Sequence, residues 1–466
     1  LQLVARALDR DLWNVPFRHP VTGHPIAISS HGHRLAAHGR LLVFSTGCYL
    51  LGINTAGSLR HGPIEIRWVQ PLIDQFVSGS AGPMFALPHW EATPWGTRRV
   101  TLRSAHSDPL GSLQPVVGRQ VTFVRGRQLV SLDVLTGEPV WVRDNVPEAS
   151  EVFGDDECIY LVPPDRSVAQ VYRTVDGAAL PSQGVPPWSQ VMRALGRKLL
   201  VWQGDGQQVT VRLFDVATQQ DVWTRSYDHS AKANFADDGR LGVLQRDGKF
   251  QLIDVASGKA LIDATVDAID PLGAIFILRH HDRYVLAATH AASAEAQQHN
   301  GWVVRPLQSA GGMQMPTING AMHGFDEQGR LVWSQPVRHL SLPLDQPSAS
   351  PVIGLMSHLY GITSQRIVRT GLGLVLVDKR TGRVIHRTMQ DGMPGAYLQH
   401  VDREGQVIEF RTNLSTVRME WTDEAWPDGA RQEPIEPKIP EPRRRPPGNA
   451  PGPNAEPQRQ PNRPNR

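Results

Sequence analysis

Cysteine and histidine are the residues of this chain most able to act as nucleophiles or metal ligands. The two cysteines, Cys48 and Cys158, each stand in an apolar strand context, which predicts buried free thiols and argues against a disulfide or a reactive site. His31 and His33 form a His-x-His pair that could bind zinc, but no third ligand follows at a suitable spacing. We therefore predict exposed loop histidines and no metal site.

Five aspartates recur at one position of a repeated sequence pattern. The clearest copy runs from Gln128 to Trp141, QLVSLDVLTGEPVW, where alternating apolar residues predict a strand, Asp133 and Gly137 a turn, and Trp141 a returning strand. An aspartate in such a turn accepts hydrogen bonds from nearby backbone N–H groups, so its recurrence predicts turn capping and no catalytic role. The tryptophans are predicted to pack between neighbouring repeat units. The predicted structural positions are Asp133, Thr136, Gly137, Trp141, Asp215, Thr218, Trp223, Asp254, Gly258, Asp326, Gly329, Trp333, Asp378 and Gly382.

The spacing of the turns is typical of a β-propeller. Gly137, Gly177, Gln219 and Gly258 lie about 40 residues apart, and four-stranded propeller blades repeat about every 40 to 50 residues. The Asp-x-x-Thr-Gly-x-x-x-Trp pattern resembles the repeat of the PQQ-like, quinoprotein-type β-propellers. That family includes quinoprotein alcohol dehydrogenases and non-enzymatic relatives such as the outer-membrane assembly propeller lipoproteins. The resemblance extends over most of residues 30–425.

The predicted fold is all-β: a single closed β-propeller of four-stranded antiparallel blades, eight in number with seven as the alternative, and a disordered C-terminal tail. Residues 1–29 are predicted to donate the strand that closes the ring, or else to end an upstream domain. Residues 30–426 are the predicted propeller, with insertions near 70–112 and 291–318; the first of these could instead be a divergent blade. Residues 427–466 are rich in Pro and Arg and too poor in apolar residues to offset their ordering entropy.

The resemblance also implies a test for a cofactor. In quinoprotein dehydrogenases the quinone lies in the central funnel above a Trp, with a Ca²⁺ ion, an Asp base and two adjacent cysteines joined in a disulfide. Here Cys48 and Cys158 are far apart in the sequence, and no clustered run of Asp, Glu and Asn offers the six or more oxygens that Ca²⁺ takes. We therefore predict no enzyme activity, no cofactor and no metal.

Composition narrows the classes of partner. The formal net charge is only +3, so no global field favours nucleic acid, and the apolar runs are too short to span a bilayer. The chain begins at Leu1 without a signal-peptide pattern, which predicts a processed chain or a fragment of a longer protein. The resemblance alone favours a periplasmic, cell-envelope or extracellular location.

The predicted function is a non-catalytic, monomeric scaffold for protein–protein interaction, as a module of a larger envelope-associated or exported protein. The alternative is a quinoprotein-like dehydrogenase, or a small-ligand binder, that uses the central funnel. Aromatic side chains in loops and a basic tail are plausible partner contacts, and the tail could contact an anionic surface or a proline-binding domain. The candidate contact residues are Trp90, Trp95, Trp302, Arg443, Arg444 and Arg445.

Overall fold

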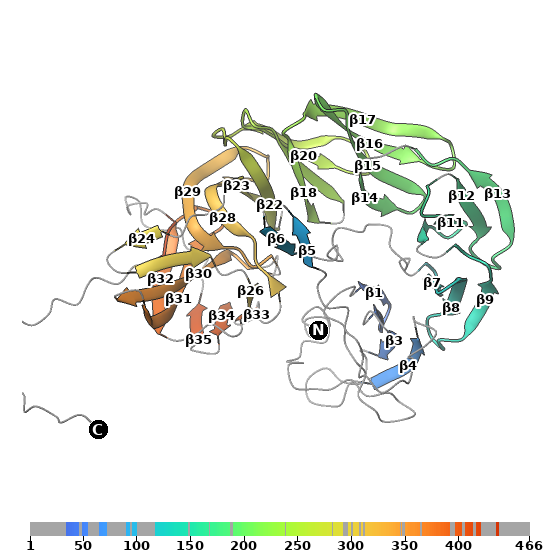
Figure 1. Cartoon of the computed structure of the whole chain (residues 1–466), viewed down its shortest axis with the longest axis horizontal. Helices are drawn as coiled ribbons and strands as arrows, with labels where there is room; N and C mark the ends of the chain where they lie inside the picture. The colour runs from blue at the N-terminus through green and yellow to red at the C-terminus, as the bar shows by residue number, and fades with distance from the viewer. Residues whose placement is uncertain are drawn as a thin grey trace, which may run out of the picture. The chain divides into compact units, whose positions relative to one another are not determined.

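The structure, a computed structural model, contains only β-strands as regular elements in the residues that it describes (Figure 1). The chain divides into two compact units, Leu1–Thr265 and Val266–Arg466. In the described ranges there is no helix of the length and apolarity needed to cross a membrane. Those ranges are residues 34–45, 49–54, 65–71, 90–93, 96–99, 117–147, 150–166, 168–186, 190–237, 239–281, 283–291, 297–299, 302–306, 309–310, 313–344, 346, 350–363, 366–391, 397–402, 406–412, 416–420 and 435–437.

Unit 1 is a succession of antiparallel sheets in which each strand pairs with the next along the chain (Figure 1). The first sheet has β1 (Arg34–His38), β2 (Leu41–Ser45), β3 (Tyr49–Asn54) and β4 (Glu65–Pro71). A three-stranded sheet follows, with β7 (Gln120–Arg125), β8 (Gln128–Asp133) and β9 (Pro139–Arg143). Three further four-stranded sheets have β10 (Glu151–Gly154), β11 (Cys158–Val162), β12 (Ala169–Arg173) and β13 (Ala179–Gln183); β14 (Gln190–Leu195), β15 (Lys198–Gly204), β16 (Gln208–Asp215) and β17 (Gln220–Asp228); and β18 (Lys232–Asp237), β19 (Arg240–Leu244), β20 (Lys249–Asp254) and β21 (Ala260–Thr265).

The core of unit 1 lies between successive sheets, so the inner sheets are covered on both faces. Val130 of β8 packs with Leu50 of β3, whereas its neighbour Leu129 points the other way and packs with Val152 of β10. Because both faces are buried, the middle strands carry near-continuous apolar runs such as LLVF and YLLG. The same arrangement places Leu200 against the sheet that follows it.

Unit 2 begins with an antiparallel set of β22 (Leu272–His280), β23 (Arg283–His290), β28 (Thr317–Phe325) and β29 (Leu331–Ser341). A second set has β30 (Val352–Thr363), β31 (Arg366–Asp378) and β32 (Val384–Asp391), and it joins the first through the pair Ser341 and Met356. Three more strands, β33 (Tyr397–Asp402), β34 (Val407–Thr412) and β35 (Thr416–Glu420), form a separate sheet. Phe410 of β34 packs on Leu374 of β31.

Both predicted insertions contain strands. The first holds a hairpin of β5 (Trp90–Thr93) and β6 (Gly96–Arg99). The second holds β24 (Gln297–His299), β25 (Trp302–Pro306), β26 (Ser309–Ala310) and β27 (Met313–Gln314), and β25 pairs with the edge of β30. The second insertion therefore contains a strand that extends a sheet.

One part of the predicted tail differs from expectation. Residues 427–466 are predicted to be disordered, yet Ile435 is fully buried and forms a parallel bridge with Val337 of β29. A single isoleucine in a Pro-rich segment can be buried where other strands offer it an apolar contact, and composition does not reveal such a contact. The N-terminal segment 1–29 and the rest of the tail lie outside the described residues.

The prediction of an all-β chain with four-stranded antiparallel sheets is confirmed for the described residues. Ring closure and the number of blades stay predictions.

Candidate functional site

The repeated turn is built by one aspartate and one residue with positive φ. In the 133–138 turn, the Asp133 N–H donates to the Glu138 carbonyl (2.9 Å) and the Asp133 carbonyl accepts from Gly137 N–H (2.8 Å). The Asp133 carboxylate accepts from Leu135 N–H (2.8 Å), and the Thr136 hydroxyl accepts from Glu138 N–H (3.2 Å). Gly137 has a φ of 73°, which a residue without Cβ adopts at little cost.

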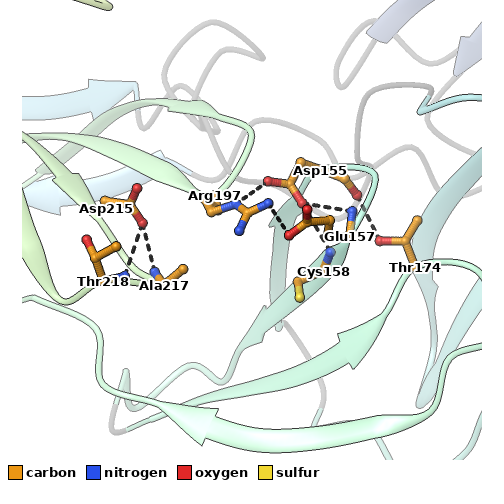
Figure 2. Close-up of polar contacts among 8 residues, drawn as sticks. All are labelled: Asp155, Glu157, Cys158, Thr174, Arg197, Asp215, Ala217 and Thr218. Atoms are coloured by element: carbon orange, nitrogen blue, oxygen red, sulfur yellow. Dashed lines mark hydrogen bonds and ion pairs between the residues drawn. The ribbon is translucent and has the colours of Figure 1, made fainter.

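The other predicted aspartates also cap turns, and the turn at Asp326 is one residue shorter than the turn at Asp133. Asp215 accepts from the N–H groups of Ala217 (2.9 Å) and Thr218 (3.3 Å), as Figure 2 shows. A hydrogen bond from the Ser257 hydroxyl lowers the pKa of Asp254 below its usual value. A hydrogen bond from the backbone N–H of Arg330 does the same for Asp326. The carboxylate of Asp378 accepts from Arg380 N–H (2.8 Å). The turn glycines Gly258, Gly329 and Gly382 all have positive φ.

Each tryptophan of the pattern is bound by a later turn. The Trp141 indole N–H donates to the carbonyl of Thr174 (2.9 Å) and its ring covers Gly177, where a Cβ would meet ring atoms about 2.6 Å away. Trp223 donates to Val255 (2.8 Å) and covers Gly258 in the same way. In unit 2, Trp333 donates to Lys379 (3.0 Å) and covers Gly382. The turn glycine is therefore required twice, once for its φ and once for the ring above it.

Sequence reasoning missed a fourth tryptophan and a second contact. Trp68 of β4 donates to the carbonyl of Val134 (2.7 Å) and covers Gly137. For the three pattern tryptophans of unit 1, the side chain two positions after the tryptophan donates a hydrogen bond to the carbonyl of the turn glycine that the tryptophan covers. These contacts are Gln70 to Gly137 (2.7 Å), Arg143 to Gly177 (2.6 Å) and Arg225 to Gly258 (2.8 Å). A recurring Trp-x-Arg/Gln triplet in the sequence could have revealed them.

The junction between the third and fourth sheets has no such tryptophan, and a glutamine takes its place. β13 contains no Trp, and the turn between β16 and β17 carries Gln219 at the glycine position, with a φ of 57°. The Gln219 amide donates to the carbonyl of Val216 (2.6 Å), which is the position that receives an indole N–H elsewhere, and also to Gly184 (2.9 Å) of the preceding sheet region. With no ring above it, this position can carry a side chain.

An ion-pair cluster joins the third and fourth sheets (Figure 2). Arg197, between β14 and β15, contacts Asp155 (2.5 Å) and Glu157 (2.7 Å) of the β10–β11 turn. The Asp155 carbonyl accepts from the Thr174 hydroxyl (2.8 Å), and the Thr174 carbonyl holds Trp141. This cluster therefore links three successive sheets. Arg197 is ion-paired with both carboxylates, and its hydrogen bonds to Asp155 and Glu157 raise the pKa of the guanidinium.

Cys158 borders this cluster as a half-buried free thiol. Burial, with a smaller effect from the charge of Asp155, raises the pKa of the thiol. A raised pKa keeps the sulfur protonated near neutral pH and so makes it a poor nucleophile. Cys48 lies outside the described residues, as do His31 and His33.

A buried lysine is the most perturbed group of unit 2. Lys379 is only 3% exposed, and burial lowers its pKa from 10.5 to about 7. Its ammonium donates to the carbonyl of Arg279 (3.3 Å), and burial together with Lys379 lowers the pKa of His280 to about 4. The equivalent position, directly after the turn aspartate, is a fully buried valine at Val134 and Val216. Sequence alignment of the repeats could have singled out this lysine.

Apolar side chains are exposed at one repeat position of unit 1. The third residue after the turn residue with positive φ is Val140 (46% exposed), Leu180 (37%), Val222 (45%) and Leu261 (40%). These residues lie on β9, β13, β17 and β21, each the last strand of its sheet. Single exposed apolar residues are ordinary, but recurrence at one register on four consecutive edge strands makes a repeated surface. We call these four residues the outer row.

The predicted partner contacts lie outside the side chains that the structure describes. Trp90 begins β5 and Trp302 begins β25, but their side chains are outside the described part of the chain. Trp95, Arg443, Arg444 and Arg445 are outside it altogether. Among the described residues, no group of three or more His, Cys, Asp or Glu side chains is placed to hold a metal ion.

No protein-family model and no curated protein matches the chain. Among solved structures, BamB from Moraxella catarrhalis is 12% identical over 84% of this chain and 95% of that chain, with a TM-score of 0.36. The dihydro-heme d1 dehydrogenase NirN in complex with DHE is 12% identical over 86% and 76%, with a TM-score of 0.33. A europium-containing methanol dehydrogenase is 8% identical over 83% of both chains, with a TM-score of 0.30. Two of these three structures are named as dehydrogenases and one is not.

Proposed function

We propose that this chain is a non-catalytic β-propeller of the PQQ-like kind that serves as a protein-binding scaffold. The observation that carries the proposal is the outer row: an exposed apolar side chain at one register of four consecutive edge strands. An edge strand offers unpaired N–H and C=O groups on one side, and apolar side chains beside it supply affinity for an extended partner segment.

The side chains that recur in the pattern are already used inside the molecule. Trp141 and Trp223 donate hydrogen bonds to turns of other sheets, and Arg197 is ion-paired with Asp155 and Glu157. These side chains therefore connect one sheet to another, which favours a rigid frame. The proposed setting is the periplasm, the cell envelope or the outside of the cell, with the chain as a module of a larger protein.

A photo-crosslinking amino acid placed at Val222 would test the scaffold in the cells that naturally make the protein. We expect a discrete crosslinked protein partner at Val222 and at Val140, because both side chains face solvent on edge strands. The matched control is Asp221, an exposed neighbour on the same strand β17. Equal crosslinking at Asp221 and Val222, or none at either outer-row position, would contradict the proposal.

The alternative of a quinoprotein-like dehydrogenase or small-ligand binder predicts a different result. The full chain would be incubated with pyrroloquinoline quinone and Ca²⁺ and assayed for alcohol oxidation with an artificial electron acceptor. We expect no turnover above that of the quinone alone. Saturable turnover that needs the protein would favour the alternative over the scaffold.

A further inference from the structure

A short segment of the C-terminal tail, Ile435–Pro437, lies inside unit 2. Ile435 is fully buried among core residues of β28–β29 and β30–β31, including Val337 and Val375. Its carbonyl accepts a hydrogen bond from the N–H of Arg338 (3.2 Å), and it forms a parallel bridge with Val337. The tail therefore makes a strand-like contact with the edge of β29.

The two strand sets of unit 2 leave room for this segment. Within the described residues, β29 pairs with β30 only at Ser341 and Met356, so the preceding part of β29 has an edge that β30 does not cover. On the other side, Gly373 of β31 leaves a notch beside the Ser357 hydroxyl, which a Cβ there would meet at 2.5 Å, and Pro437 borders this notch, with its Cβ 3.6 Å from the same point. A free strand edge facing a notch is the geometry that accepts an extended peptide.

The segment does not satisfy every polar group of the notch. The Ser357 hydroxyl lies beside the same notch at Gly373, is fully buried and has no hydrogen-bond partner among the described residues. Proline has no N–H to give it. Among the described contacts, the segment Ile435–Pro437 is held by one apolar side chain, one backbone hydrogen bond and one proline ring. A segment with so few contacts can detach from unit 2 while the sheets around it stay folded.

We propose that the space between β29 and β31 is a binding site for an extended peptide of the form aliphatic, any residue, proline, and that the chain's own Ile435–Pro437 occupies it and blocks it to other peptides. Val337 and Arg338 supply the strand edge for the aliphatic residue, and the proline lies beside Gly373. This site is separate from the outer row and stands whether or not the scaffold function is correct.

Peptide binding to the full chain tests the proposal. A fluorescent peptide with the sequence of residues 430–441 would be titrated, by anisotropy, with the wild-type chain and with Ile435→Asp, which releases the tail. We expect at least tenfold tighter binding to Ile435→Asp than to the wild type, because an aspartate cannot replace the buried side chain. The same peptide carrying the Ile435→Asp change should bind neither chain. Leu344→Asp, the same kind of change at an exposed residue of unit 2, should behave like the wild type.

Limited trypsin digestion of the same full-length chains gives a second measurement. Arg431 and Lys438 flank the segment, so cleavage after them should be at least tenfold faster in Ile435→Asp, as followed by mass spectrometry. Ile435→Ser provides a milder variant should the aspartate disturb folding, which circular dichroism would detect. Peptide binding that is equal for both chains, or absent from both, would overturn the proposal, as would equal cleavage rates.

Discussion

Replacing Lys379 by methionine should stabilise the protein and remove part of its dependence on pH. The folded chain keeps the lysine buried with a pKa of about 7, whereas the unfolded chain returns it to 10.5. Because the folded pKa is the lower one, the unfolded chain binds more protons between these two values. Stability therefore rises with pH through this window and is lowest below pH 7.

The size of the effect follows from the two pKa values. They differ by about 3.5 pH units, and each unit corresponds to about 1.4 kcal/mol, so the charge costs the folded state about 5 kcal/mol at pH 6. At pH 9 the folded chain holds the lysine neutral, and the remaining cost to the folded state is about 2 kcal/mol. Methionine fills a similar volume without a charge. The stability gain of Lys379→Met over the wild type should therefore shrink by about 3 kcal/mol between pH 6 and pH 9.

Urea unfolding followed by circular dichroism at pH 6, 7, 8 and 9 would measure this difference. The other titrating groups are present in both chains, so their effects cancel except at His280, whose pKa is lowered mainly by burial and in smaller part by Lys379. Lys249→Met is the matched control because it makes the same substitution at a lysine that is exposed on β20. A stability difference between Lys379→Met and the wild type that is the same at pH 6 and pH 9 would refute the reasoning.

Three further substitutions test the contacts between sheets by the same unfolding measurement. Trp223→Phe keeps a ring but leaves the buried carbonyl of Val255 without its donor, and should cost about 2 kcal/mol; an unchanged unfolding midpoint would contradict this role. Gly258→Ala should cost about 3 kcal/mol, because the methyl group adds positive-φ strain and meets the indole ring, whereas Gly118→Ala, with positive φ and open space, should cost about 1 kcal/mol; equal losses would mean that the ring does not matter. Arg197→Met leaves two carboxylates without their cation and should cost about 1 to 2 kcal/mol, with a smaller loss at 1 M salt; a loss that does not respond to salt would argue against the ion pairs.

Local chemistry was predicted well because it acts over a few residues. The turn at Asp133 and Gly137 needs only one carboxylate, one positive φ and the residues between them, all visible in the sequence. The same holds for the all-β class, since alternation and turn spacing are properties of short windows. The strand β25 in the second insertion was not predicted, because it takes its partner from β30, which is distant in the chain.

By itself, the sequence determined where the repeat units turn, that the segments beside these turns become strands, and that the units repeat. Only the tertiary structure decided what each tryptophan binds, because the residue that accepts its N–H lies 32 to 66 positions further along the chain. The same is true of the buried amine of Lys379 and the buried side chain of Ile435: each is an ordinary polar or tail residue until other strands remove it from water. Burial is a property of how separate segments pack, and the local pattern around a residue does not contain it.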